Sequence, residues 1–338
     1  MSGEQSTTRT AGLVKAAKRA IAEFTADGGT DLAAALTYYG VLSLFPAILA
    51  LTSLLGVFGQ GPDTTGKLLD VLREMGVADE QLSTIEGYVK GLQDTGGAGI
   101  ALFIGLAAAL WASSNYVNAF SRAMNKIFDV EEGRPIWILR PVMLLLTLVT
   151  LLLVVAVALS LALSGTVAEA IFGVVGLSDE ATRVWNLAKW PVMFLIIVIA
   201  VGILYWGTPN LKRRFRLISP GALVAIVVMV IALGGFGFYI SMFGNYEATY
   251  GVMAGAILML LLLWVINLAL LFGAAFDAEF ERSRQLAEGL PAEELLQLPP
   301  RDSRNARKKA AKQQEIIEEN RRIRIEAGRS RPHDPQDD

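Results

Sequence analysis

The sequence predicts an all-α, polytopic membrane protein: a six-transmembrane-helix bundle with short amphipathic helices on its extracytoplasmic side. Of its 338 residues, 53% are hydrophobic and 18% are charged, whereas soluble domains usually carry about 25% charged residues. The apolar residues gather in separate blocks, each long enough to cross roughly 30 Å of hydrocarbon, which takes about 20 residues. The Lys and Arg residues are concentrated in alternate connections between these blocks. Together, these three observations favour integration into a membrane.

The apolar blocks divide the chain into three regions. We expect a cytoplasmic N-terminal segment at 1–30, a transmembrane domain at 31–282, and a charged, partly disordered cytoplasmic tail at 283–338. The predicted spans are residues 33–58, 98–120, 137–164, 184–206, 218–243 and 251–275.

The charge partition predicts the orientation of these spans. Of the 30 Lys and Arg residues, 25 lie in the N-terminal segment, the second and fourth connections and the tail. Because cytoplasmic loops are enriched in Lys and Arg, both termini are predicted to be cytoplasmic. That orientation requires an even number of spans, and six agrees with it.

Two segments outside the spans have helical patterns. The first outer connection, residues 60–97, repeats apolar residues every three or four positions, which predicts two short amphipathic helices. These helices either cap the outer mouth of the bundle or lie at the membrane interface. In the tail, Glu and Arg residues three and four apart predict a helical part, and the final residues are predicted to be disordered.

The first span contains the stretch YYGVLSLFP, residues 38–46. Pro46 removes a backbone donor and clashes with the carbonyl of Leu42, so we expect a kink. That carbonyl then needs a donor from Ser43, water or a neighbouring helix. We expect the polar side chains Thr37, Tyr38, Tyr39 and Ser43 to face the bundle interior. They either line a substrate path or form a helix–helix contact, and the sequence leaves both open.

Polar residues in the later spans form a second group. Asn115 and Asn118 share a helix face with Arg122. Asn267 lies deep in the sixth span, where a lone amide usually hydrogen-bonds a neighbouring helix. Asp277, near the cytoplasmic end of that span, either neutralises the basic loops or, if it lies deeper, is a candidate proton or ion site.

Prolines and glycines predict how the fourth and fifth spans begin, end and pack. Pro209 is expected to end the fourth span, and Pro220 to begin the fifth near its first turn. The fifth span becomes glycine-rich at Gly234, Gly235 and Gly237. We expect close helix packing at these glycines, either within the chain or at a dimer seam.

The composition excludes several kinds of chemistry. There is no cysteine, and the single histidine, His333, lies in the charged tail. Thiolate–metal sites, disulfides and cysteine nucleophiles are therefore absent. No phosphate-binding glycine loop, zinc-protease motif or nucleophile elbow is present. We expect a protein that is not an enzyme, with no cofactor, no metal site and no nucleic-acid partner.

Several stretches together resemble the YihY/BrkB family of bacterial inner-membrane proteins. They are LAAALTYYGVLSLFPAILAL, NAFSRAMNKIFDVEEGRPIWILR, YWGTPNLKRRFRLISPGALVA and YEATYGVMAGAILMLLLLWVINLALLFGAAFDAEFER. The resemblance covers about residues 15–285 and implies six spans in the inner membrane. It also implies a role in envelope integrity, with transport, including lipid export, suggested. Part of the family once carried the label ribonuclease BN, which is regarded as a misassignment.

One departure from the family pattern concerns the last span. Similar proteins commonly read GAELNAE where this chain reads GAAFDAE, from Gly273 to Glu279. The glutamate of that pattern is Ala275 here, and its asparagine is Asp277. A role of that glutamate therefore does not transfer to Ala275.

We weigh three functions. The first is a transporter of an amphiphilic or anionic envelope substrate such as a lipid, and the second is a non-transporting scaffold for envelope integrity. The third, a membrane-bound ribonuclease, is disfavoured by the lack of metal-binding histidines. The partners expected are membrane lipids, with envelope-assembly proteins or a second copy as alternatives.

The transporter hypothesis comes with candidate site residues. Substrate-path candidates are Tyr38, Tyr39, Ser43, Pro46, Asn115, Asn118, Asn267 and Asp277. Head-group candidates are Arg122, Arg134, Arg140, Arg213 and Arg214, because guanidinium groups suit phosphate. The same arginines also orient the protein in the membrane, so this basic rim is either functional or only topogenic.

Overall fold

The computed structural model describes residues 15–58, 98–162, 179–214, 218–242 and 252–329, together with Ser83 and Gly87. Within these ranges the regular structure is helical, and the described residues contain no β-strand. Residues 15–26 form a helix before the first long one. The long helices are α2 (Gly29–Phe58), α5 (Ala98–Ile127), α6 (Ile136–Ala162), α8 (Asp179–Gly207), α9 (Pro220–Met242), α11 (Val252–Ala287) and α12 (Arg304–Arg329).

Each predicted span coincides with one of these helices. Among the described residues, α6, α8, α9 and α11 contain segments that are long and apolar enough to cross a membrane. The helix α2 runs without a break through Pro46, but its side chains from residue 44 onward lie outside the described residues, as do those of 98–102 in α5. The kink at Pro46 and the total of six spans therefore stay predictions. The amphipathic helices expected at 60–97 also lie outside the described residues.

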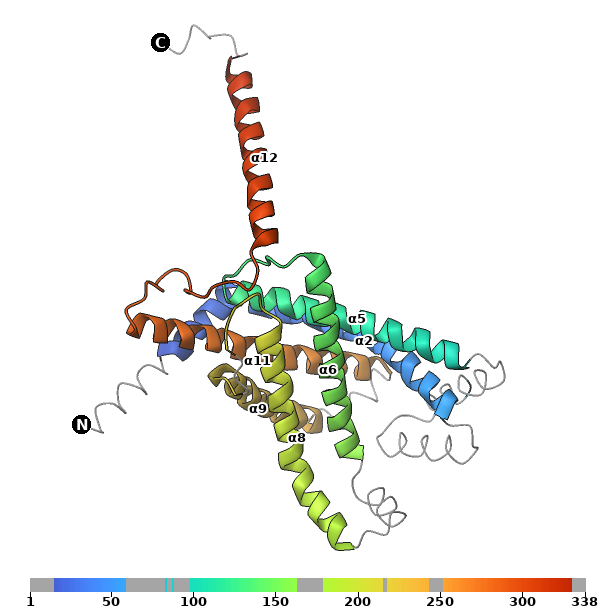
Figure 1. The fold of residues 1–338 in the computed structure, drawn as a ribbon. Helices are drawn as coiled ribbons and strands as arrows, with labels where there is room; N and C mark the ends of the chain where they lie inside the picture. The colour runs from blue at the N-terminus through green and yellow to red at the C-terminus, as the bar shows by residue number, and fades with distance from the viewer. Residues whose placement is uncertain are drawn as a thin grey trace, which may run out of the picture.

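The helices pack as neighbours in sequence and across it (Figure 1). α2 lies along α5, α6 lies beside α8, and α11 contacts both α9 and α2. Large apolar side chains on the outer faces of α6 and α9 are exposed, including Leu152, Val230 and Ile231. Because exposed apolar surfaces of this extent are unusual on soluble monomers, they fit a lipid environment.

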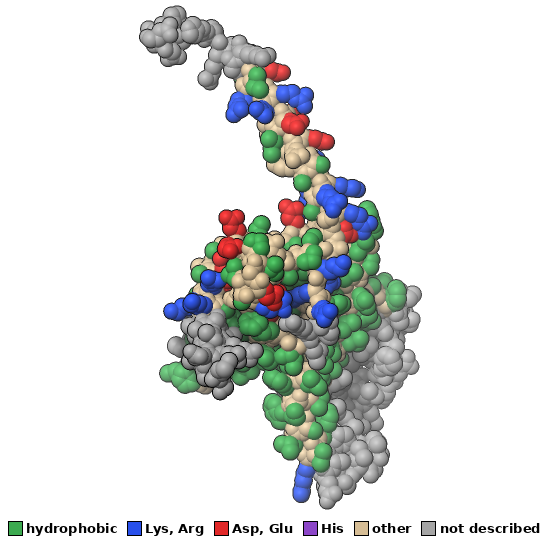
Figure 2. Space-filling view, turned by 60° about the vertical axis from the view of Figure 1, so that its left-hand side comes forward, with side chains coloured by type: hydrophobic (Ala, Val, Ile, Leu, Met, Phe, Trp, Pro, Cys, Tyr) green, Lys and Arg blue, Asp and Glu red, His purple; other side chains and the backbone are tan. Residues whose placement is uncertain are grey.

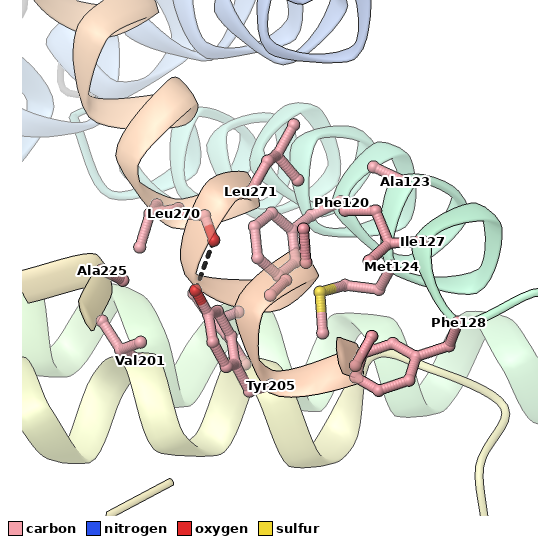
Figure 3. Packing of buried hydrophobic residues seen from close by; sticks show 14 of the residues in the cluster. Phe120, Ala123, Met124, Ile127, Phe128, Val201, Tyr205, Ala225, Leu270 and Leu271 are labelled. Atoms are coloured by element: carbon pink, nitrogen blue, oxygen red, sulfur yellow. Dashed lines mark hydrogen bonds between the residues drawn. The ribbon is translucent and has the colours of Figure 1, made fainter. Parts of the chain in front are cut away.

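The buried core lies where α5, α8 and α11 meet (Figure 3). Phe120 and Met124 of α5 are fully buried there, as is Leu271 of α11. The Tyr205 hydroxyl donates to the carbonyl oxygen of Leu270, and its ring stacks on that of Phe120 with centroids 6.3 Å apart. The core thus joins three helices that are far apart in sequence.

The predicted helix boundaries at the two prolines are confirmed. α8 ends at Gly207, two residues before Pro209, and α9 begins at Pro220. α12 confirms a helical part in the tail. The segment before α12 packs back on the bundle, where Leu211 and Pro300 form an isolated antiparallel bridge.

Among the described residues, the glycines near the end of α9 make no close helix contact, so close packing there, within the chain or at a dimer seam, stays a prediction. A Cβ built on Gly234, Gly235 or Gly237 meets no atom of the described residues within 4 Å. Close approach occurs instead at the other end of the helix, where a Cβ on Gly221 would lie 2.2 Å from the carbonyl oxygen of Gly273 in α11. The reason is that α9 contacts α11 through its first turns, so its glycine-rich end has no described helix against it.

Candidate functional site

Charged side chains gather at one end of the bundle, around the base of α12, while the sides of the bundle are mostly apolar (Figure 2). This charged end contains the connections that follow α5 and α8, and the segment between α11 and α12. The connections bring arginines from several parts of the chain together with buried carboxylates. This charged end is therefore the candidate functional site.

A cavity of about 380 Å³ opens at the charged end, between the last turns of α8, the start of α9 and the later part of α11. We call it the basic pocket. Its charged lining residues are Lys212, Arg213, Arg214 and Arg284, with Asp277 and Glu281 as the acidic members. Aromatic walls from Tyr205, Trp206 and Phe280 enclose it.

The ion pair between Arg213 and Asp277 forms the inner wall of the basic pocket. Arg213 Nη1 lies 3.0 Å from Asp277 Oδ2, and the two side chains are 21% and 8% exposed. Asp277 also accepts from the backbone N–H of Gly221 at 3.3 Å, and Arg213 donates to the carbonyl oxygen of Tyr205. Asp277 thus neutralises a basic connection, as one of the two sequence alternatives held, and it fixes the start of α9 against α11.

The mouth of the basic pocket carries cations that are less engaged. Lys212 and Arg214 are exposed, and among the described residues neither has a carboxylate partner. Arg284 is different, because its Nη2 lies 2.6 Å from Glu281. Lys212 and Arg214 are therefore the two lining cations open to an anionic ligand.

Arg134 is buried rather than displayed on the rim. Its side chain is 4% exposed and pairs with Glu132 at 2.6 Å. It also donates to Ser121 Oγ at 3.1 Å and to the carbonyl oxygen of Thr208 at 2.7 Å. These contacts tie the connection after α5 to the end of α8, which is a structural use of the guanidinium.

Asn210 is a central residue that the sequence reasoning missed. It is fully buried, and its amide nitrogen donates to the carbonyl oxygens of Glu131 and Asp302 at 2.9 and 2.8 Å. Its Oδ1 accepts from the Asp302 N–H at 3.2 Å. Asn210 thereby joins three segments at the charged end. Its position directly after Pro209, where α8 has just ended, was the available signal.

The segment before α12 is also bound to the residues that follow the end of α8. Arg301 donates to the carbonyl oxygens of Leu211 and Trp206, and its guanidinium carbon lies 4.8 Å from the centroid of a Trp206 ring. Hydrogen bonds from Arg304 lower the pKa of Asp302 to about 2. Asp302 is therefore ionised across the physiological pH range and does not act as a pH switch there.

The polar side chains of α2 do not all lie on one face of the helix. Thr37 is buried, but Tyr38 is 61% exposed, so the prediction that Tyr38 faces inward is wrong. Consecutive residues point about 100° apart on a helix, and the inward side is already occupied by Ala33, Leu36 and Thr37. Tyr38 instead lines an apolar groove of about 490 Å³ between α2 and α11, beside Trp264.

The remaining candidates of the first two spans make separate contacts. Ser43 donates to the carbonyl oxygen of Gly40 at 2.6 Å, so it does not serve the Leu42 carbonyl. Tyr39 lies under the guanidinium of Arg122, whose carbon is 5.7 Å from the ring centroid. The side chain of Pro46 lies outside the described residues.

Asn115 of α5 lies toward α6. Asn115 Oδ1 accepts from Arg140 Nη1 at 3.3 Å, and the Arg140 guanidinium also lies 5.4 Å from the Trp111 ring centroid. Asn118 is half-buried. Arg140 is therefore engaged by α5, whereas Arg122 is exposed at the rim.

Asn267 joins three helices, as expected of a lone amide in an apolar span. Its amide nitrogen donates to Thr37 Oγ1 at 3.1 Å, and its Oδ1 accepts from the Tyr116 hydroxyl at 2.7 Å. The network connects α11 with α2 and α5. Within it, the polar side chains of the three helices hydrogen-bond one another in an apolar environment.

The sequence-predicted residues thus fall into separate places. The basic pocket brings together Asp277, Arg213 and Arg214, while Tyr38 lies in the apolar groove and Asn267 in the helix interior. Among the described residues, no group of three His, Cys, Asp or Glu side chains is placed to hold a metal ion. The arrangement thus places a pocket lined by four cations and two carboxylates at one end of an apolar bundle.

Comparison with known proteins identifies a family and several relatives. The family model described as "Virulence factor BrkB" matches residues 20–295. The ribonuclease-like protein YfkH of Bacillus subtilis (strain 168) is 30% identical over 274 residues, covering 81% of this chain and 98% of YfkH. No solved structure matches.

Further relatives are named only as membrane proteins. A UPF0761 membrane protein of Xanthomonas campestris pv. campestris (strain B100) is 27% identical over 79% of this chain. One from Alkalilimnicola ehrlichii is 28% identical, also over 79%. The matches span about 60% of the length of these UPF0761 relatives.

Proposed function

The chain belongs to the virulence factor BrkB family of membrane proteins, and from this premise we propose that it transports an anionic amphiphile of the bacterial envelope, such as a lipid, across the inner membrane. In this proposal all six apolar helices span the bilayer, and both termini and the charged end are cytoplasmic. The observation that carries the proposal is the basic pocket at the end of the apolar bundle.

The chemistry of the pocket mouth supports an anionic head group. Lys212 and Arg214 are exposed cations without a carboxylate partner among the described residues. Guanidinium and ammonium groups form strong charge-assisted hydrogen bonds to phosphate oxygens. The inner wall supplies no further free cation, because Arg213 is held by Asp277. The proposal therefore assigns head-group binding to Lys212 and Arg214.

The surroundings of the pocket supply apolar surface for the rest of an amphiphile. The outer faces of α8 and α9 expose large apolar side chains such as Phe194 and Leu223. Earlier along α11, away from the basic pocket, the groove beside Tyr38 and Trp264 is a separate apolar surface. A charged mouth next to such faces suits a ligand with an anionic head and a hydrocarbon tail.

Lipid translocation in proteoliposomes tests the proposal. The purified full chain is compared with the double variant Lys212→Gln/Arg214→Gln, using a fluorescent phosphatidylglycerol and a fluorescent phosphatidylcholine. The expected result is faster movement of the anionic lipid by the native chain and a loss of that preference in the variant. The matched control, Arg307→Gln/Lys308→Gln, removes two exposed charges from α12 and is expected to keep the preference. No movement of the anionic lipid by the native chain contradicts the proposal.

A scaffold for envelope assembly is the second candidate, because α12 extends away from the bundle (Figure 1). Deleting residues from Arg304 onward removes this helix and keeps the packed segment before it. Partners that copurify with the full chain and are lost on this deletion, while lipid movement is absent from both proteins, favour the scaffold.

We also propose that the chain is not a nuclease, although YfkH is named ribonuclease-like. The sequence has one histidine and no cysteine, which leaves few of the side chains that bind catalytic transition metals. Highly purified protein is expected to leave a labelled RNA intact with Mg²⁺ or Mn²⁺ present. Cleavage that follows the protein through purification and stops on chelation contradicts this.

A further inference from the structure

Beyond its first turn, α12 packs against no other described helix. It runs over 26 residues, about 39 Å at 1.5 Å per residue, and every residue from Arg307 to Ala327 is exposed. Four isoleucines are among them: Ile316, Ile317, Ile323 and Ile325 are 41–58% exposed. Ile316, Ile317 and Ile323 lie on one side of the helix, whereas Ile325 lies on the opposite side. Most helices in proteins are stabilised by packing of an apolar face, and the side with three isoleucines has no packing partner among the described residues.

The residues of α12 follow a seven-residue repeat. Ile316 and Ile323 are seven apart, and both lie on one side of the helix. The positions three or four residues from them also repeat by seven: Ala306, Gln313, Asn320 and Ala327. These two sets of positions lie along one side of the helix, where the two seam positions of a coiled coil lie. Lys309 departs from this pattern, so residues 313–327 carry the strongest part of the seam.

We propose that α12 pairs with α12 of a second copy of this chain, as a parallel two-stranded coiled coil. Two features of the sequence favour a copy over another partner. Asn320 would face its own counterpart across an in-register seam, and a single asparagine at this position favours two strands in one register. Glu319 and Arg324 occupy the flanking positions, so that each Glu319 faces Arg324 of the other helix. The face is thus complementary in charge to itself.

The attachment of α12 favours the parallel arrangement. Its start is held on the bundle, where the N–H of Asn305 donates to the carbonyl oxygen of Gly133 at 2.8 Å and Asp302 is bound by Asn210. Chains inserted in the same orientation project α12 from the same side of the membrane. Confinement to one membrane raises the local concentration of the partner, so a short seam is enough for association.

Single-cysteine crosslinking tests the pairing directly, because the native chain has no cysteine. Gln313→Cys places a thiol on the seam, where facing residues come within disulfide distance, and Glu318→Cys places one on the opposite face. In proteoliposomes of the full chain, mild oxidation is expected to link two chains through position 313 and to leave the position 318 variant mostly as single chains. Equal crosslinking at both positions, or none at 313, overturns the proposal.

Two further variants separate pairing of α12 from contact elsewhere in the protein. In the Gln313→Cys background, Ile316→Lys is expected to reduce crosslinking at least fivefold. Glu319→Arg is also expected to weaken it, because it faces Arg324 of the partner helix, and adding Arg324→Glu is expected to restore it. Crosslinking that ignores Ile316→Lys, or a charge exchange without restoration, overturns the assigned register. A predominant three-chain product in a trifunctional crosslinking experiment overturns the two-stranded state.

Discussion

The ion pair between Arg213 and Asp277 allows a prediction with a magnitude. At the observed separation of 3.0 Å, two unit charges attract by about 5.5 kcal/mol when the effective dielectric constant is about 20. Removing one partner of a buried pair usually destabilises a protein by about 3–5 kcal/mol, because the other charge is left without compensation. Arg213 is 21% exposed, and water can solvate that part. We therefore expect Asp277→Ala to lower the free energy of unfolding by about 3 kcal/mol.

A double-mutant cycle isolates the pair from other effects. Asp277→Ala and Arg213→Met are each expected to destabilise the protein by about 3 kcal/mol. The double variant should lose about 2 kcal/mol less than the sum of the two, since the second change removes a charge already unpaired. The assay is equilibrium unfolding of the purified protein in mixed micelles with increasing SDS, followed by far-ultraviolet circular dichroism.

A surface pair at the same end of the bundle provides the control. Arg284 lies closer to its partner Glu281, at 2.6 Å, but is 44% exposed. Arg284→Gln is expected to change the free energy of unfolding by less than about 1 kcal/mol, as exposed pairs do. If Arg284→Gln destabilises the protein as much as Asp277→Ala, or if the two changes in the cycle simply add, burial is not what makes the Arg213–Asp277 pair strong.

Three other changes test the packing by the same unfolding assay. Gly221→Ala is expected to destabilise the protein by about 1–3 kcal/mol, since the added Cβ would press on the backbone of α11. Gly234→Ala, where no described atom lies near the added Cβ, should stabilise it by about 0.5–1 kcal/mol through helix propensity. Equal effects of the two changes contradict the contact between Gly221 and α11. Asn267→Leu should lower the stability by about 1 kcal/mol, because the Tyr116 hydroxyl loses its acceptor, and an unchanged stability argues against that bond. Asn210→Ala should lower the free energy of unfolding by about 2–4 kcal/mol, since three buried hydrogen bonds are lost. It should also speed tryptic cleavage after Arg301. An unchanged cleavage rate argues that Asn210 does not hold the segment before α12 on the bundle.

Much of the fold follows from local features of the sequence. Each apolar block forms a helix, because a long apolar stretch satisfies its own backbone groups in that conformation. Pro220 begins α9 for the local reason that proline lacks an N–H and fits the first helical turn. The helix in the tail also follows from the local spacing of Glu and Arg.

Local sequence features predicted only part of the candidate site. Neutralisation of the basic loops was one of two roles that the sequence allowed for Asp277, and its partner Arg213 could not be told apart from the other basic residues nearby. Arg134 was predicted to be a rim cation and is instead buried with Glu132. Asn210 gave only the weak signal of a polar residue after a helix-ending proline, and its partners lie about 80 and 90 residues away.

The sequence by itself thus determined which segments are apolar helices, where several of them begin and end, and which connections carry the positive charge. Only the tertiary structure decided which side of each helix faces inward, as Tyr38 and Thr37 show. The physical reason is that a helix surrounded by lipid and by other apolar helices is apolar on all sides, so its sequence carries little amphipathic signal. The facing sides are instead set by contacts between distant segments, such as Gly221 against Gly273 and Asn267 against Thr37.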